Sequence, residues 1–105
     1  MFVLQLEIPI VTIKHILTYC KANGIVSILN PAPASSELLL SDPVFECVDY
    51  LIPNETESQL ITGMTNTASA DDMMELLVKS RKHMTVIMTL GGEGAFVGYD
   101  EKVYI

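Results

Sequence analysis

The residues best suited to chemistry in this chain are polar groups that directly follow short apolar runs. Glu7 follows the run at residues 2–6, and Asn54 with Glu57 follows the run at residues 50–52. Each has a structural interpretation beside a functional one. Asn54 and Glu57 have the spacing of a capping box, in which two side chains satisfy free amides at a helix start. Glu7 is either a carboxylate favoured by a helix dipole or a ligand-binding group.

Two further polar stretches follow apolar runs. The loop at residues 91–94, Gly-Gly-Glu-Gly, follows the run at residues 85–90, and Asn30-Pro31-Ala32-Pro33 follows the run at residues 25–29. The glycine loop is not a P-loop, because it lacks the GK[ST] ending and leads into an expected strand. A bare GGxG is more often a turn than a phosphate site. The Asn-Pro stretch is typical of a rigid turn.

Composition excludes several classes of function. The chain has 105 residues, half of them hydrophobic, and a formal net charge of -7. This acidity argues against nucleic-acid and anionic-membrane partners, which attract clustered Lys and Arg. No apolar run approaches the roughly 18 residues of a membrane span, and the opening residues 1–5 contain no Lys or Arg. Cys20 and Cys47 form no CxxC pair, and His15 and His83 have no partners at metal-ligand spacing, so we expect free thiols, solvated histidines and a cytoplasmic setting.

Strands and helices are expected to alternate along the chain. Short apolar or β-branched runs predict strands at residues 2–6, 25–29, 50–52 and 85–90, and a hairpin that pairs residues 95–98 with 102–105. Apolar spacing of three or four predicts helices at residues 10–23 and 54–63 and a third helix that begins at Ser69. A short helix over residues 38–40, interrupted at Asp42-Pro43, is a weaker expectation. The alternation predicts a three-layer, doubly wound α/β fold with a mostly parallel sheet.

This topology gathers the polar groups. In open parallel sheets, ligands bind outside the carboxyl ends of the strands. Glu7, Asn30, Asn54 with Glu57, and the loop at residues 91–94 follow the four strands in turn. The sequence therefore predicts one ligand-binding edge.

Four segments together resemble the ribokinase-like family of sugar and nucleoside kinases. They are, in order along the chain, Leu4-Gln5-Leu6-Glu7, Leu29-Asn30-Pro31-Ala32-Pro33-Ala34, Pro53-Asn54-Glu55-Thr56-Glu57 and Thr89-Leu90-Gly91-Gly92-Glu93-Gly94. The resemblance covers nearly the whole chain. The spacing between Asn30 and Asn54 is a few residues longer than the family pattern, which leaves the structure of residues 34–48 open.

The resemblance implies transfer of the ATP γ-phosphoryl group to the 5-hydroxyl of D-ribose. By the same resemblance, Glu7 binds the sugar hydroxyls, and Glu57 positions magnesium through bound water. The ATP-binding residues that it implies are Asn54, Thr89, Leu90, Gly91, Gly92, Glu93 and Gly94. It also implies a homodimeric parent enzyme and leaves room for a potassium ion.

One element of the family pattern is missing from this sequence. The family's catalytic aspartate lies in a GAGD-type motif, and no such motif occurs here, so no catalytic residue is assigned. Because the first and last residues are both expected in strands, we interpret residues 1–105 as a single partial domain. Because the family's catalytic aspartate is missing from it, we expect this part to be inactive alone. Two alternatives stay open: another sugar or nucleoside kinase of the same fold, and a non-catalytic product that binds nucleotide or a partner.

Overall fold

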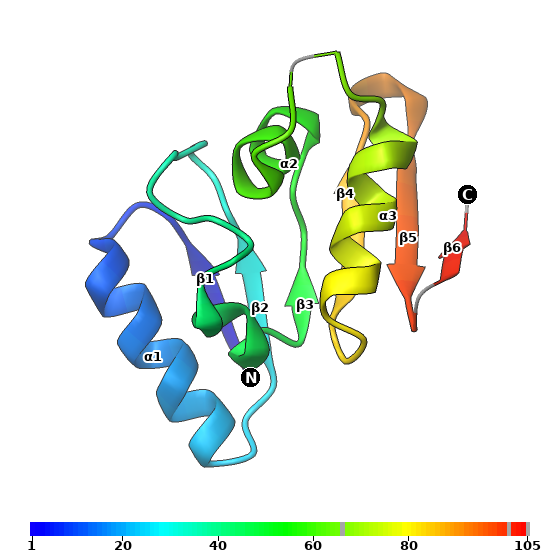
Figure 1. The fold of residues 1–105 in the computed structure, drawn as a ribbon. Coiled ribbons are helices and arrows are strands. Elements are labelled where there is room, and N and C mark those ends of the chain that lie inside the picture. Colours follow the sequence, from blue (N-terminus) through cyan, green and yellow to red (C-terminus); the bar gives the residue numbers. More distant parts are fainter. Residues whose placement is uncertain (66, 101, 105) are drawn as a thin grey trace.

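The computed structural model describes residues 1–65, 67–100 and 102–104, which form a six-stranded sheet in the order β1-β2-β3-β4-β5-β6 (Figure 1). The first four strands are parallel, and β5 and β6 are antiparallel additions. The strands are β1 (Phe2–Gln5), β2 (Ser27–Asn30), β3 (Tyr50–Leu51), β4 (Thr85–Thr89), β5 (Ala95–Tyr99) and β6 (Lys102–Tyr104). The α/β class expected from the sequence is confirmed, and so is the hairpin for residues 102–104. Residue 105, the expected end of its second strand, lies outside the described residues.

The helices begin and end close to the positions that the sequence indicates. They are α1 (Ile10–Ala22), α2 (Glu55–Thr62) and α3 (Ala70–Ser80), with 3-10 turns η1 (Pro43–Cys47) and η2 (Gly91–Glu93). Ser69 caps α3 in a box with Asp72, and α2 ends at Gly63 in the left-handed conformation. In the part of the chain that the structure describes, no helix is both long and apolar enough to span a membrane.

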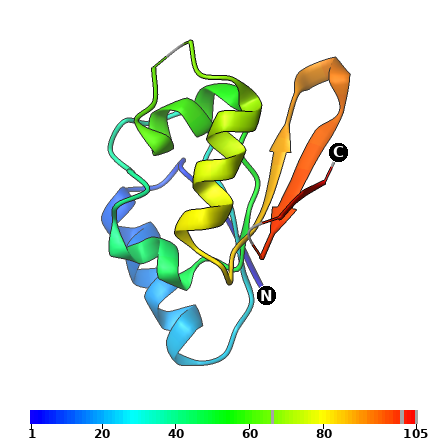
Figure 2. The same ribbon diagram turned by 45° about the vertical axis from the view of Figure 1, so that its right-hand side comes forward.

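The helices pack on one face of the sheet. The parallel strands lie side by side in the order of the sequence. Right-handed crossovers between such strands place every connecting helix on the same face of the sheet. Figure 2 shows α1, α2 and α3 on one face. Alternate strand residues such as Leu29, Leu51 and Met88 are completely buried against this layer. On the opposite face Val3 and Tyr50 are exposed. The described residues thus form the sheet and one helical layer; the second helical layer of a three-layer fold is not among them.

The expected helix over residues 38–40 is wrong. Leu38 and Leu40 are buried in a non-helical segment, and the Leu40 amide donates to the Ile61 carbonyl at 2.8 Å, so tertiary contacts fix this backbone. The helical turn begins at Pro43 instead of ending before it. Asp42 caps this turn by accepting from the Val44 amide at 2.9 Å, and proline suits a first helical position.

Strand β2 also begins later than expected, at Ser27. The Ile25 amide donates to the Cys20 carbonyl at 2.9 Å, which closes the end of α1. The Ser27 amide donates to Asp49 Oδ2 at 2.9 Å, and Ser27 Oγ donates to the Cys47 carbonyl at 2.7 Å. These bonds tie the beginnings of β2 and β3 together at the edge opposite the polar groups.

Candidate functional site

Asn54 and Glu57 form a reciprocal capping box at the start of α2. Asn54 Oδ1 accepts from the Glu57 amide at 2.7 Å, and Glu57 Oε1 accepts from the Asn54 amide at 3.0 Å. The Glu57 residue is only 6% exposed, whereas Asn54 is exposed. The box uses Asn54 Oδ1 and Glu57 Oε1 and so fixes the orientation of both side chains. Asn54 Nδ2 and the second carboxylate oxygen of Glu57 take no part in these two bonds. The structural and ligand-binding interpretations of the pair are therefore compatible.

Strand β4 is bonded directly to this box. The Thr89 amide donates to the Pro53 carbonyl at 2.9 Å, and Asn54 and Thr89 form a parallel β-bridge. This bridge continues the β3–β4 pairing beyond the end of β3. The structure thereby brings together Asn54, Glu57 and Thr89, as the parallel topology predicts.

The glycine loop closes immediately after Thr89. The Leu90 amide donates to the Gly94 carbonyl at 2.8 Å, and Gly91 and Gly94 have φ angles of 62° and 101° that side chains disfavour. Gly92 differs from both only in its φ, which lies outside the positive range; a Cβ at any of the three glycines would have no atom within 4 Å. The turn therefore needs glycine at residues 91 and 94. At residue 92 the fold does not need it, and the open space lets another molecule approach the backbone.

Glu7 lies at the same edge of the sheet but apart from this cluster. It is exposed in the turn after β1, which is separated from β3 by β2. The Leu6 amide donates to the Ala32 carbonyl at 2.8 Å, which joins this turn to the Asn-Pro segment after β2. Asn30 is half-buried and is the register partner of Gln5. The edge thus has two parts, one around Glu7 and Asn30 and one around Asn54 and Thr89.

The donor set fits a hydrated magnesium ion and not a ligand cage. Among the described residues, no group of three or more His, Cys, Asp or Glu side chains could hold a metal. Glu57 offers one carboxylate, and one of its oxygens already accepts from Asn54. Magnesium retains several waters and is commonly bound by one or two carboxylates plus substrate phosphates, so Glu57 fits contact through water.

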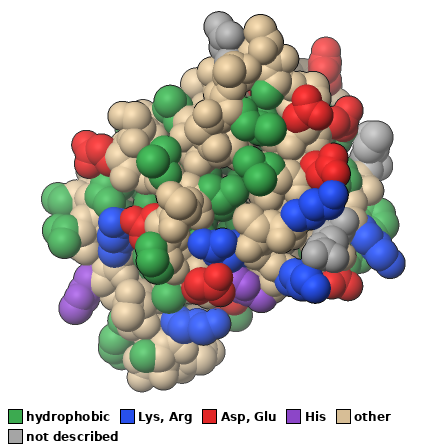
Figure 3. All heavy atoms as spheres, viewed as in Figure 1, with side chains coloured by type: hydrophobic (Ala, Val, Ile, Leu, Met, Phe, Trp, Pro, Cys, Tyr) green, Lys and Arg blue, Asp and Glu red, His purple; other side chains and the backbone are tan. Residues whose placement is uncertain are grey.

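The side chains at this edge of the sheet carry a net negative charge. The stretches at residues 54–57 and 89–94 contain three Glu and no Lys or Arg. Figure 3 shows acidic side chains gathered toward the upper right of the face viewed, and Asp71 and Asp72 lie in the first turn of α3. A phosphorylated ligand would meet unfavourable charge here unless a cation accompanied it.

Ser58 belongs to this site and escaped the sequence analysis. It is fully buried, and its Oγ donates to the Asn54 carbonyl at 2.7 Å. A signal existed: a serine four residues after a predicted N-cap can reach the cap carbonyl. The capping spacing alone did not reveal it.

Two hollows of the described surface lie away from this cluster. One of about 320 Å³ runs along the outer side of α3, and one of about 190 Å³ lies near Lys21 and Asp49, before the beginnings of β2 and β3. Neither is lined by the residues predicted to bind ligand. His15 is exposed, and His83 Nδ1 lies 4.0 Å from Glu46 Oε2. Cys20 is buried and Cys47 half-buried, both as free thiols.

Comparisons of the sequence with known proteins show a family and individual relatives that it resembles. A model of the pfkB family of carbohydrate kinases matches residues 3–105. The chain is 38% identical over 96 residues to the ribokinase of Staphylococcus aureus (strain COL), a match that covers 90% of this chain and 30% of that protein. It is 34% identical over 110 aligned positions to the deoxyribokinase of Salmonella typhi, which covers 100% of this chain and 34% of that protein.

A solved structure shares the same arrangement. The structure of Arabidopsis thaliana ribokinase complexed with ribose and ATP matches with a TM-score of 0.73 at 27% identity, covering 97% of this chain and 33% of that chain. The family resemblance and the partial ribokinase-like fold are thus confirmed. The chain spans about a third of the length of the relatives it matches.

Proposed function

The chain belongs to the pfkB family of carbohydrate kinases, and on this premise we propose that it is the nucleotide-binding part of an ATP-dependent ribokinase. The parent enzyme would transfer the γ-phosphoryl group of ATP to the 5-hydroxyl of D-ribose. Support for ribose comes from similarity to bacterial ribokinases and to a plant ribokinase complexed with ribose and ATP.

One observation carries the proposal: the bridge between Asn54 and Thr89 places the capping box beside the glycine loop. Asn54 Nδ2 is the donor that the capping bonds leave for a phosphate oxygen, and Gly92 has open space on the side where a Cβ would lie. Glycine backbone and helix-start donors are common means of holding phosphate. In this proposal Thr89, Leu90, Gly91, Gly92, Glu93 and Gly94 contact the nucleotide together with Asn54.

Magnesium would accompany the nucleotide, because the site is acidic and contributes no Lys or Arg. When bound, the ion would neutralise charge on the phosphates. Glu57 would hold its water shell, and the box with Asn54 would keep that carboxylate at a fixed position. A potassium ion elsewhere in the parent enzyme is compatible with these contacts.

Glu7 would bind the sugar. Its exposed carboxylate can accept hydrogen bonds from two adjacent hydroxyls, and it lies on the same edge as the phosphate-binding groups. The base that accepts the proton of the 5-hydroxyl would come from a GAGD-type segment outside these 105 residues. We therefore expect the isolated chain to be inactive and the parent to work as a cytoplasmic homodimer.

The proposal is tested in two steps. Calorimetry of the 105-residue chain with ATP should give binding that requires magnesium. The full-length product of the gene should phosphorylate D-ribose with ATP, and the isolated chain should not. Turnover of ribose by the isolated chain, or no sugar phosphorylation by the full-length product, would contradict the proposal.

A second candidate substrate is deoxyribose, because the Salmonella typhi deoxyribokinase matches the whole chain at 34% identity. The two sugars differ at the 2-hydroxyl. A site that hydrogen-bonds this hydroxyl should discriminate strongly against the deoxy sugar, since its polar groups would be left unpaired. Comparison of kcat/KM for ribose and 2-deoxyribose with the full-length protein decides between them.

A further inference from the structure

We propose that Ser58 is a positioning residue, whose buried hydroxyl holds the Asn54 peptide so that the Asn54–Glu57 box presents its free groups to a magnesium-bound nucleotide. The inference rests on the proposed function for the identity of the ligand. The positioning itself rests on contacts within α2 and can be measured without any ligand.

The Asn54 carbonyl accepts two hydrogen bonds from the same residue. One comes from the Ser58 amide at 2.9 Å, and the other comes from Ser58 Oγ at 2.7 Å. The first is the ordinary helical bond and already satisfies the carbonyl. The hydroxyl therefore adds a bond that the helix does not require.

Packing does not explain the hydroxyl either. Ser58 is completely buried, so a small side chain is needed at this position, but alanine is smaller and is the better helix former. A serine that bonds back to the carbonyl four residues earlier slightly disfavours a helix. Neither the helix nor the core needs this oxygen.

The second capping box in the chain provides an internal comparison. In α3 the equivalent position is Met73, whose amide donates to the Ser69 carbonyl and whose side chain has no hydroxyl. The two bonds of that box measure 3.1 and 3.4 Å, against 2.7 and 3.0 Å for the corresponding bonds of the Asn54 box. The box with the added hydroxyl bond is the shorter one, and it is the one at the candidate site.

The hydroxyl can act on the ligand only through Asn54. Asn54 is joined to Thr89 on one side and to Glu57 on the other. A peptide that rocks at Asn54 would move both the Nδ2 donor and the Glu57 carboxylate. Holding this peptide still lowers the ordering cost of binding.

Ser58→Ala is the test, with Thr62→Val as the matched control. Thr62 Oγ1 donates to the Ser58 carbonyl at 2.8 Å, lies 3.3 Å from the Gln59 carbonyl and accepts from the Met64 amide at 3.4 Å. The control therefore removes the same kind of bond one turn later, together with two longer contacts, and leaves Asn54 untouched. Amide hydrogen exchange by NMR is measured on the 105-residue chain at Asn54 and Glu57, with Ser69 and Asp72 as internal references. Calorimetry measures Mg-ATP binding by the same variants.

We expect Ser58→Ala to speed exchange at Asn54 and Glu57 and to raise the Kd for Mg-ATP roughly five- to tenfold, as for the loss of one hydrogen bond. The control should change neither. Unchanged exchange in Ser58→Ala, or an equal effect of Thr62→Val, would overturn the proposal. Faster exchange with unaltered Mg-ATP binding would also overturn it, because the rigidity would then serve only the fold.

Misfolding of Ser58→Ala and failure of the unaltered chain to bind Mg-ATP can each be told apart from the results above. If Ser58→Ala does not fold, Ser58→Cys, which is slightly larger and keeps a weak donor, should give intermediate exchange and affinity. If the unaltered chain binds no Mg-ATP, the nucleotide contact in the proposed function fails, and the exchange data still decide whether Ser58 holds the box.

Discussion

Arg81, the residue after α3, donates a hydrogen bond from Nη2 to the carbonyl of Leu40 at 3.2 Å, across 41 positions of sequence. Its Nη1 donates to the Ser80 carbonyl at 3.0 Å, and its Nε lies 2.9 Å from Glu46 Oε1. The side chain is 16% exposed. Arg81 therefore connects the irregular segment around Leu40 to the end of α3 by a hydrogen bond.

We expect Arg81→Ala to lower the free energy of unfolding by roughly 2 to 3 kcal/mol, because hydrogen bonds to a largely buried charged group are lost together. Urea denaturation followed by circular dichroism measures this. Lys79→Ala is the control, since Lys79 pairs with Glu75 on the exposed surface of α3 and such pairs contribute about 0.5 kcal/mol or less. Equal losses in the two variants would contradict this assignment.

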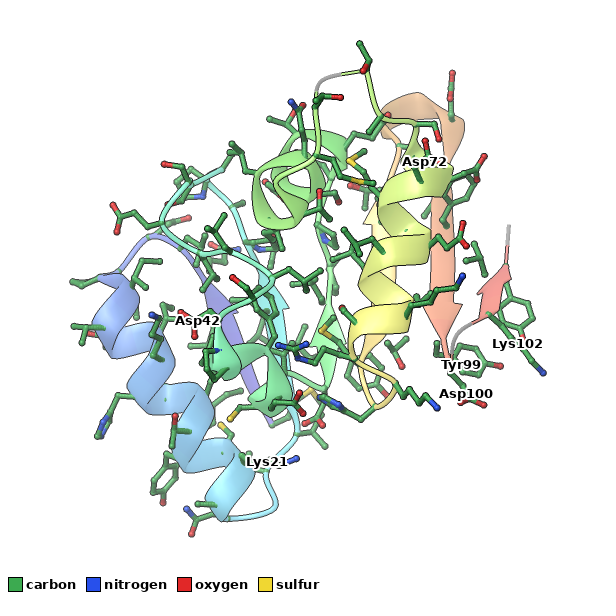
Figure 4. All side chains as sticks on the ribbon, in the orientation of Figure 1. Lys21, Asp42, Asp72, Tyr99, Asp100 and Lys102 are labelled. Carbon is green, nitrogen blue, oxygen red and sulfur yellow. The ribbon has the colours of Figure 1, made fainter. Side chains whose placement is uncertain are left out.

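Asp42 should make the free energy of unfolding depend on pH in the acidic range. The hydrogen bond from Lys14 and then the Val44 amide hold the pKa of Asp42 below its ordinary value of 3.8. Asp42 faces α1 from the segment before η1 (Figure 4), and Lys14 Nζ lies 2.5 Å from its Oδ2. A lowered pKa in the folded state gives stability that is present above pH 3.8 and lost as the pH falls through the folded pKa.

Asp42→Asn should test this contribution, because asparagine still caps η1 but cannot pair with Lys14 as an anion. The difference in unfolding free energy between the two proteins should be constant from pH 5 to 7 and should shrink below about pH 3.8. It should also shrink in high salt, since the pair is partly exposed. A difference independent of pH would assign the effect to something other than charge.

Gly92 and Gly94 should respond differently to alanine. Gly94 has a φ of 101° that alanine does not readily adopt, so Gly94→Ala should cost about 1 to 3 kcal/mol of stability. Gly92→Ala should leave stability unchanged or raise it by up to about 1 kcal/mol. If the nucleotide approaches the backbone there, Gly92→Ala should raise the Kd for Mg-ATP by about tenfold. Thermal denaturation and calorimetry separate the two effects, and full-strength binding by Gly92→Ala would exclude that approach.

Asn54→Asp separates capping from binding. Aspartate is as good an N-cap as asparagine, so the unfolding free energy should change little. The variant loses the Nδ2 donor and adds a negative charge next to phosphate, so Mg-ATP binding should weaken by tenfold or more. Ser69→Asp, in the box of α3, is the control and should bind Mg-ATP normally. An Asn54→Asp chain that binds as tightly as the unaltered chain would remove Asn54 from the site.

The sequence was informative where structure depends on near neighbours. The Asn54–Glu57 box and the start of α3 at Ser69 follow from spacing within one helical turn. The gathering of Asn54 and Thr89 at one edge was also predictable, because parallel strands have their carboxyl ends on the same side. The ligand roles of these residues stay predictions.

What only the tertiary structure decided depends on contacts between distant segments. The leucines at residues 38–40 suggested a short helix. In the structure, the backbone of Leu40 is instead bonded to α2 and to Arg81, and no local sequence pattern indicates those distant partners. The role proposed for Ser58 also depends on the tertiary structure. Ser58 is buried, so its hydroxyl needs a hydrogen-bond partner, and the bridge from Asn54 to Thr89 places that partner at the candidate site. Short-range hydrogen bonds can be inferred from residue order, whereas burial and long-range pairing depend on how the whole sheet and its helices pack.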